Sequence, residues 1–106
     1  MGAETDFVVV CCTAAPGEAE SLARALVEEH LAACVNIASV RSCYIWEDKL
    51  NLDCEALLII KTTMSRFEPL QKRILELHSY AVPEIIALPI AEGHQPYLDW
   101  VARSVG

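Results

Sequence analysis

The sequence predicts an α+β fold in which strands and helices follow one another in the order β-α-β-β-α-β, with an additional helix at the C-terminus. Short β-branched runs alternate with stretches that have the apolar spacing of helices. A polar break without Gly or Pro divides the longest β-rich segment into two halves of a hairpin. The 106 residues contain no repeat and no Gly/Ser linker, so one domain spanning residues 1–106 is expected.

The first half of the chain supplies a strand, a helix and a long hairpin. Residues 7–12, with the sequence FVVVCC, are β-branched, precede the turn segment TAAPGE and are predicted to form a buried strand. The apolar spacing predicts a helix over residues 18–33, with glutamates in its first turn. Paired strands are expected over residues 34–46 and 50–62, with a bulge or a strand bend near Ser39 and Val40, where the alternation slips.

The second half supplies a helix, a strand and the terminal helix. Ser65 and Glu68 form an S-x-x-E capping box, which predicts a helix over residues 65–78. Residues 81–93 are predicted to contain a strand, and Pro89 places it at an edge of the sheet. Pro96 opens a helix over residues 96–104. Right-handed β-α-β crossovers place both main helices on one face of an antiparallel sheet, which is the ferredoxin-like pattern.

The predicted sheet is apolar on both faces, although the two main helices cover only one. FVVVCC and ALLII offer no polar side to water, and hydrophobic residues make up 54% of the chain. Typical soluble domains have roughly 45–50%. Because monomers rarely expose apolar patches larger than a few hundred Å², we expect other copies of this chain to cover the second face.

Composition excludes several classes of partner. The chain has 8 Lys and Arg against 15 Asp and Glu, a formal net charge of −7 that repels nucleic acid. The mean hydropathy is +0.31, yet no apolar run approaches the roughly 20 residues that span a bilayer. Residues 1–10 lack the features of a secretory signal, and five cysteines without regular spacing indicate no disulfide framework. A cytoplasmic location is therefore expected.

A thiol and an imidazole are the candidate metal ligands. Neighbouring strand residues point to opposite faces, so one of Cys11 and Cys12 faces the helices. Cys11 is expected to fill the core, whereas Cys12 lies nearer the turn and is either core or ligand. His78, which closes the second predicted helix, is either a ligand or a cation at the helix C-terminus. Thiolate and imidazole together suit copper or zinc.

Catalytic motifs are missing from the sequence. It contains no G-x-S-x-G, no Walker loop and no G-x-G-x-x-G. An acylphosphatase, which shares the predicted fold, would need an arginine in TAAPGE, which has none. WEDK, at the expected tip of the hairpin, fits either a solvated turn or a binding segment. No enzymatic activity is expected.

Several segments carry a family resemblance, namely VVVCCTA, EEHLAACVNI, YIWEDKL with EALLIIKT, and HSYAVPEIIALPI with YLDW. In this order and with this spacing they resemble the CutA family of divalent-cation tolerance proteins over residues 7–101. The resemblance implies a ferredoxin-like homotrimer, similar in architecture to PII signalling proteins, whose sheets pack around a threefold axis. The resemblance therefore implies that the chain associates with two further copies of itself in a homotrimer and with divalent metal ions. It implies no association with nucleic acid or a membrane.

The resemblance also implies positions for a metal site. Cys12 in CTA and His78 in HSY match copper ligands of bacterial relatives. Leu77 and Ser79 depart from the family's H-H-P-Y motif, so one imidazole is missing. The implied cofactor is therefore Cu(II) or another divalent metal, bound weakly.

Further matching positions are expected to line clefts between subunits. Glu47 and Lys49 match the family's W-E-G-K motif, in which Asp48 replaces the glycine. The other matching residues are Glu55, Lys61, Tyr80 and Glu84. The resemblance thus implies a non-catalytic protein of divalent-cation tolerance. The alternative is a PII-like trimeric scaffold or signalling protein that binds a small molecule or partner protein at these clefts.

Overall fold

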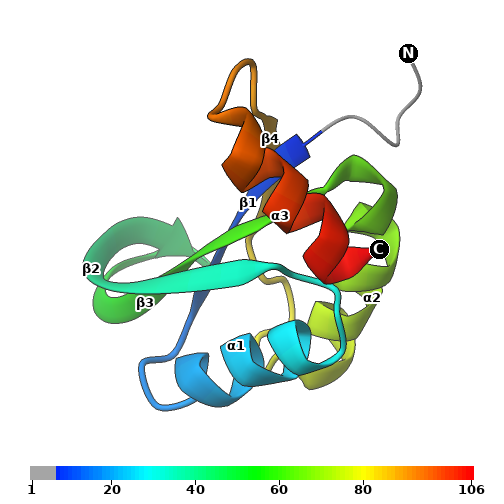
Figure 1. Ribbon diagram of the computed structural model, residues 1–106. Coiled ribbons are helices and arrows are strands. Elements are labelled where there is room, and N and C mark those ends of the chain that lie inside the picture. The colour runs from blue at the N-terminus through cyan, green and yellow to red at the C-terminus, as the bar shows by residue number, and fades with distance from the viewer. Residues whose placement is uncertain (1–6) are drawn as a thin grey trace.

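The fold is a four-stranded antiparallel sheet with three helices, as Figure 1 shows. The computed structural model describes residues 7–106. Residues 1–6, part of the segment in which no secretory signal is predicted, lie outside the described residues. The elements are β1 (Phe7–Ala14), α1 (Ala19–Glu28), β2 (Cys34–Trp46), β3 (Lys49–Thr63), the 3-10 turn η2 (Met64–Arg66), α2 (Phe67–Leu77), β4 (Ile85–Pro89) and α3 (Gln95–Val105). The predicted ferredoxin-like order with an extra C-terminal helix is confirmed.

The core lies between one face of the sheet and helices α1 and α2. Alternate residues of β1 are fully buried, among them Val8, Val10 and Cys12. They form one cluster with Leu26 of α1 and Ile74 of α2. Since burying one such aliphatic side chain contributes roughly 1.5–3 kcal/mol, this cluster is the main source of stability.

Helix α3 covers one end of the opposite face of the sheet. Phe7 points away from the neighbouring Val8 and packs against Val101 and Val105 of α3. The Nε of Arg66 donates a hydrogen bond of 2.6 Å to the carbonyl oxygen of Val105, which fixes the end of this helix. The expectation that only one face receives helices is thus corrected at this end.

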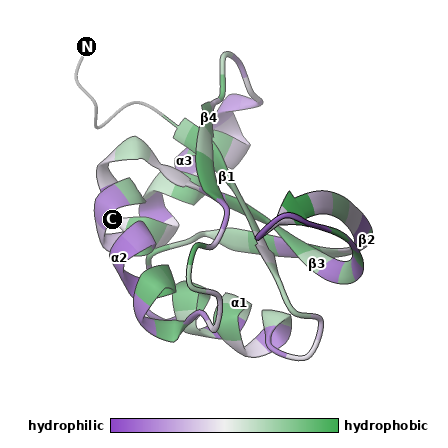
Figure 2. Cartoon of the chain, turned by 180° about the vertical axis from the view of Figure 1, so that it is seen from behind, coloured by the Kyte–Doolittle hydropathy of each residue, from purple (hydrophilic) through white to green (hydrophobic). Residues whose placement is uncertain are grey.

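The part of the second face formed by β1 and β4 stays apolar and open within one chain. Ile86 and Leu88 of β4 are about half exposed, and Val9 and Cys11 lie on the same side of β1. Figure 2 shows hydrophobic colouring along both strands. Strand order β2-β3-β1-β4 makes β4 an edge strand, as Pro89 predicted.

Helix α1 ends at Glu28, five residues before the predicted end. His30 takes a positive φ of 60°, and the N–H groups of Leu31 and Ala32 both donate to the carbonyl of Leu26. The chain then turns towards β2. Leu31 and Ala32 are buried in the core without being helical, so their apolar character extended the predicted helix beyond its real end.

The predicted capping box is corrected, and of the two alternatives near Ser39 and Val40, a bulge or a strand bend, the bulge is ruled out. No side chain caps α2, and the hydroxyl of Ser65 lies 3.1 Å from that of Thr63, because a 3-10 turn precedes the helix. The β2–β3 register runs unbroken from Cys34 opposite Lys61 to Trp46 opposite Lys49. The alternation slips because the hairpin extends beyond the helices, not because a residue is inserted.

The hairpin turn consists of Glu47 and Asp48, both with left-handed backbone, at φ of 51° and 64°. A two-residue turn with this geometry favours glycine, especially at its second position. Asp48 therefore occupies a conformation that side-chain-bearing residues adopt at a cost.

Replacing Asp48 with glycine is expected to stabilise the protein by about 1 kcal/mol, because the left-handed backbone costs glycine less. The free energy of unfolding from urea titrations measures this. Asp53→Gly, in the extended part of β3, is the matched control and should destabilise the chain. An unchanged or lowered stability of Asp48→Gly would contradict the strained turn.

Candidate functional site

A cleft of about 640 Å³ lies between the projecting β2–β3 hairpin and the loop after α2. Its volume is in the range of small-molecule sites. We call it the arm cleft. It is lined by Thr13, Ser42, Cys43, Tyr44, Trp46, Asp53, Glu55, Tyr80, Ala81, Val82 and Glu84.

Strand geometry places most of these side chains together. Side chains two residues apart share a face of a strand, so Ser42, Tyr44 and Trp46 line one side of β2. Ser42 lies opposite Asp53 in the β2–β3 register, which puts Asp53 and Glu55 on the same face. The unbroken hairpin register therefore builds one wall of the cleft.

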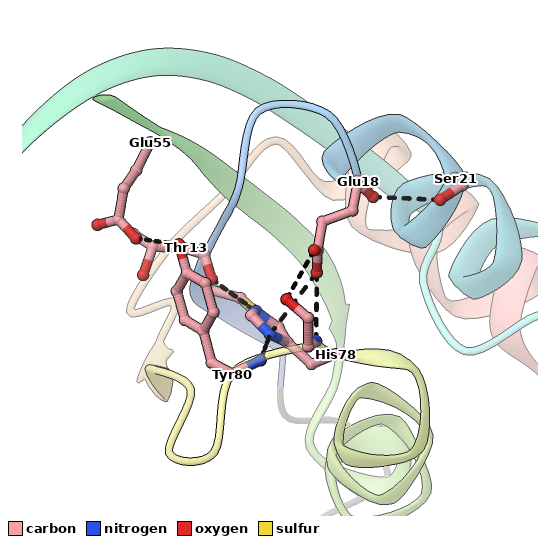
Figure 3. Close-up of polar contacts among 8 residues, drawn as sticks. Thr13, Glu18, Ser21, Glu55, His78 and Tyr80 are labelled. Atoms are coloured by element: carbon pink, nitrogen blue, oxygen red, sulfur yellow. Dashed lines mark hydrogen bonds and ion pairs between the residues drawn. The ribbon is translucent and has the colours of Figure 1, made fainter. Parts of the chain in front are cut away.

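Two tyrosine hydroxyls are bound to two carboxylates in this wall. The Tyr80 hydroxyl donates to Oε2 of Glu55 at 2.7 Å, and the Tyr44 hydroxyl donates to Oδ2 of Asp53 at 2.6 Å. Figure 3 shows the first pair. Burial and the bond to Glu55 raise the pKa of Tyr80, and the bond to Asp53 raises the pKa of Tyr44. Both hydroxyls therefore remain protonated donors at physiological pH.

The charge of the cleft is negative. Asp53, Glu55 and Glu84 line it, and its lining includes no Lys or Arg. Behind it, burial first and then the charge of Glu84 raise the pKa of the Cys12 thiol to about 12. A negative potential that disfavours a thiolate favours a cation.

His78 fastens the loop of the cleft to the end of β1. Its side chain is fully buried. Nε2 lies 2.8 Å from the Thr13 carbonyl oxygen, and the Tyr80 N–H donates to Nδ1 at 3.1 Å. Because a carbonyl only accepts and an amide N–H only donates, the ring is the neutral tautomer with its proton on Nε2. Glu18, whose Oε1 lies 3.9 Å from Nδ1, accepts a bond of 2.7 Å from the Ser79 hydroxyl (Figure 3).

Cys12 and His78 both adjoin Thr13, but neither has a free donor atom for a metal. Cys12 is fully buried and its thiol donates to the Thr13 carbonyl at 3.7 Å. Cys11, expected in the core, is instead partly exposed on the open face, so its expected role is corrected, whereas the burial of Cys12 agrees with the core alternative. Over residues 7–106, no group of three or more His, Cys, Asp or Glu side chains is arranged to hold a metal ion. The assignment of Cys12 and His78 as copper ligands therefore stays a prediction.

The structure gathers three of the six predicted cleft residues in the arm cleft, namely Glu55, Tyr80 and Glu84. Lys61 instead donates to the side-chain oxygen of Asn36 on the open face. Glu47 and Lys49 lie exposed at the hairpin turn. Sequence reasoning missed Tyr44 and Asp53 and named Trp46 only as part of WEDK, although the spacing of two between the aromatic residues could have placed them on one face.

These features define a small ferredoxin-like protein whose sheet carries an acidic cleft. Residues 7–104 match the family of CutA1 divalent ion tolerance proteins, and the chain belongs to this family. The predicted family is thus confirmed. No helix within residues 7–106 is long and apolar enough to cross a membrane.

The chain is similar to curated relatives from several kingdoms. It is 52% identical over 89 residues to the divalent-cation tolerance protein CutA of Thermus thermophilus, which covers 83% of this chain and 86% of the relative. It is 48% identical over 99 residues to the chloroplastic protein CutA of Arabidopsis thaliana, covering 92% of this chain but 54% of that protein. The chain thus spans only about half the length of the plant relative.

Solved structures have the same fold. The Thermus thermophilus protein superposes with a TM-score of 0.90 at 48% identity, covering 94% of this chain and 99% of that one. A protein of Archaeoglobus fulgidus is described as a periplasmic divalent cation tolerance protein. It superposes with a TM-score of 0.91 at 37% identity, covering 94% of this chain and 99% of that one. A PII-like protein CutA of Nostoc superposes with a TM-score of 0.90 at 33% identity, covering 93% of this chain and 97% of that one.

The variant Tyr80→Phe is expected to lose about 1–3 kcal/mol of stability, because it leaves the carboxylate of Glu55 buried without its donor. Glu55 is only 7% exposed, whereas Asp53 is exposed and regains water in Tyr44→Phe. Urea titrations of both variants measure the difference. Equal losses of stability in Tyr80→Phe and Tyr44→Phe would show that Glu55 is hydrated in solution.

Proposed function

We propose that this chain acts in divalent-cation tolerance as a non-catalytic protein that binds divalent cations weakly. Membership of the CutA1 family supports the role in tolerance. The observation that carries the binding proposal is the arm cleft, with Asp53, Glu55 and Glu84 in its lining and no basic side chain. Such a cleft concentrates cations near it. The cytoplasm is the proposed location, while the relatives from Arabidopsis and Archaeoglobus are described as chloroplastic and periplasmic.

For a thiophilic ion we propose Cu(II), with Cys12 and His78 as ligands. A thiol and an imidazole beside Thr13 support this choice, since copper prefers such donors. Binding is expected to be weak for two reasons. The ion must displace a proton from a thiol whose pKa is about 12, and it must replace one of the two hydrogen bonds of the imidazole.

Copper binding through Cys12 should depend steeply on pH. Release of one thiol proton per ion raises the apparent affinity about tenfold per pH unit around neutrality, whereas carboxylate ligation is flat there. Calorimetric titration with Cu(II) measures this, with exposed Cys43 and Cys54 replaced by serine in every variant.

The variants separate the two kinds of ligand. Cys12→Ala and His78→Ala should each weaken Cu(II) binding at least about tenfold, as loss of a metal ligand does. Glu84→Gln should weaken binding of every divalent ion, and Glu92→Gln, on an exposed loop, serves as the control. If Cys12→Ala and His78→Ala bind Cu(II) with the same affinity and the same pH dependence as the protein that keeps both side chains, neither residue is a ligand. Equal affinity in Glu84→Gln would count against the cleft.

We also propose that the chain forms a homotrimer in which open faces cover one another. The apolar residues left on that face support this, since Val9, Ile86 and Leu88 lie there without a covering helix. Association removes such surface from water, at roughly 25 cal/mol for each Å².

Sedimentation equilibrium should give the mass of three 11.7 kDa chains. A charge on the open face should break the assembly, so Ile86→Asp is expected to sediment as smaller species. Leu75→Asp on α2 is the matched control, because Leu75 is 54% exposed and Ile86 is 50% exposed. A wild-type protein that sediments as a single chain at micromolar concentration would refute the trimer.

The second candidate function is that of a PII-like scaffold or carrier that binds a small molecule. The volume of the arm cleft, about 640 Å³, favours it because a single ion needs far less space. The likeness to the Nostoc protein described as PII-like is a likeness of fold.

A further inference from the structure

The arm cleft is rich in hydrogen-bond acceptors. Its tyrosine hydroxyls, which would otherwise be its best donors, already donate to Glu55 and Asp53. Each of these carboxylates accepts through one named oxygen and keeps a second oxygen to accept from a ligand. Glu84 adds a third carboxylate. A ligand that matches this surface must therefore donate hydrogen bonds and carry positive charge.

Aromatic rings supply the rest of the surface. Tyr44 and Tyr80 are each held by a hydroxyl bond, so their rings stay oriented, and within one chain they are 39% and 36% exposed. Trp46 is 49% exposed. Ring faces beside carboxylates attract organic cations, because the ring quadrupole adds to the negative charge. Methylene groups of a ligand can pack on the same rings.

Glu55 adds to the attraction for a cation. This carboxylate is only 7% exposed; its Oε2 accepts from the Tyr80 hydroxyl at 2.7 Å, and within residues 7–106 no Lys, Arg or His forms an ion pair with it. A neutral hydroxyl donor leaves the negative charge of a buried carboxylate without an opposite charge beside it. The ammonium group of a ligand would supply that charge.

The size of the cleft favours an organic cation over a bare metal ion. The cleft measures about 640 Å³, and within the described residues no three ligating side chains converge on one point. Tyrosine hydroxyls bound to Asp53 and Glu55 also keep these two carboxylates from closing on a small ion. Several separate carboxylates suit a ligand with several separate charges.

We propose that the arm cleft binds an aliphatic diamine or polyamine, with its ammonium groups on the carboxylates of Asp53, Glu55 and Glu84 and its methylene chain along the rings of Tyr44 and Trp46. This inference rests on the cleft being a binding site, as proposed above for the second candidate function. It does not depend on a metal site at Cys12 and His78.

Calorimetric titration of the full chain with putrescine and with spermidine tests the proposal. Spermidine should bind more tightly than putrescine, and added salt should weaken both, because the attraction is largely electrostatic. The neutral 1,4-butanediol, which has the carbon chain of putrescine, should not bind. Magnesium ions, which the same carboxylates bind weakly, should displace spermidine only at concentrations well above that of spermidine.

Variants locate the site. Glu84→Gln should weaken spermidine binding about tenfold through loss of one charged hydrogen bond, while Glu92→Gln, with the same change in net charge, should not. Trp46→Ala should weaken it about fivefold through loss of the cation–π contact. Trp100→Ala on α3 is its matched control, because Trp100 is 41% exposed.

The possible results are distinguishable. Binding of butanediol as tight as that of putrescine, or equal losses in each variant and its control, would overturn the proposal. So would spermidine binding no tighter than that of magnesium. If the amines fail while Glu84→Gln still weakens divalent-ion binding, only this inference falls and the proposed metal function stands.

Discussion

The hairpin is far longer than the helices that pack on it, and the position of the cleft follows from this difference. β2 and β3 have 13 and 15 residues, whereas α1 and α2 have 10 and 11. At about 3.3 Å per strand residue and 1.5 Å per helical residue, the strands extend over about 43 and 50 Å and the helices over about 15 and 17 Å. The helices therefore cover only one end of the hairpin. The other end projects and borders the loop that follows α2 (Figure 1).

Burial along β3 changes at the point where the helices stop. Leu58 and Ile60 are fully buried, whereas Leu50 and Leu52, on the same face of the strand, are 74% and 59% exposed. Alternation alone thus does not decide whether a side chain meets water. Carboxylates on the projecting part avoid the full cost of desolvation, so acidic and aromatic side chains can share one surface there. Glu55, where the projecting part begins, is the buried exception and depends on the hydroxyl of Tyr80.

The sequence was enough to predict features that depend on local chemistry. It was not enough where a feature depends on contacts between residues far apart in the chain. Strand order, the terminal helix opened by Pro96 and the edge position of Pro89 follow from periodicity and from proline geometry. The early end of α1 depends on where the chain must join β2, which no local pattern reveals. The pairs Tyr44–Asp53 and Tyr80–Glu55 depend on a register and on a loop position. Tyr80 and Glu55 could therefore be named but not joined, and Tyr44 and Asp53 were missed.

His78 links the two proposed binding sites. Its neutral ring holds the N–H of Tyr80, and Tyr80 in turn holds Glu55 in the arm cleft. A metal ion bound to Nδ1 would have to displace that N–H, and one bound to Nε2 would have to displace the Thr13 carbonyl. Either change loosens the attachment of the loop that carries Tyr80. Since coupling between two sites is reciprocal, a ligand that needs an ordered Tyr80 would weaken metal binding at His78 by the same factor.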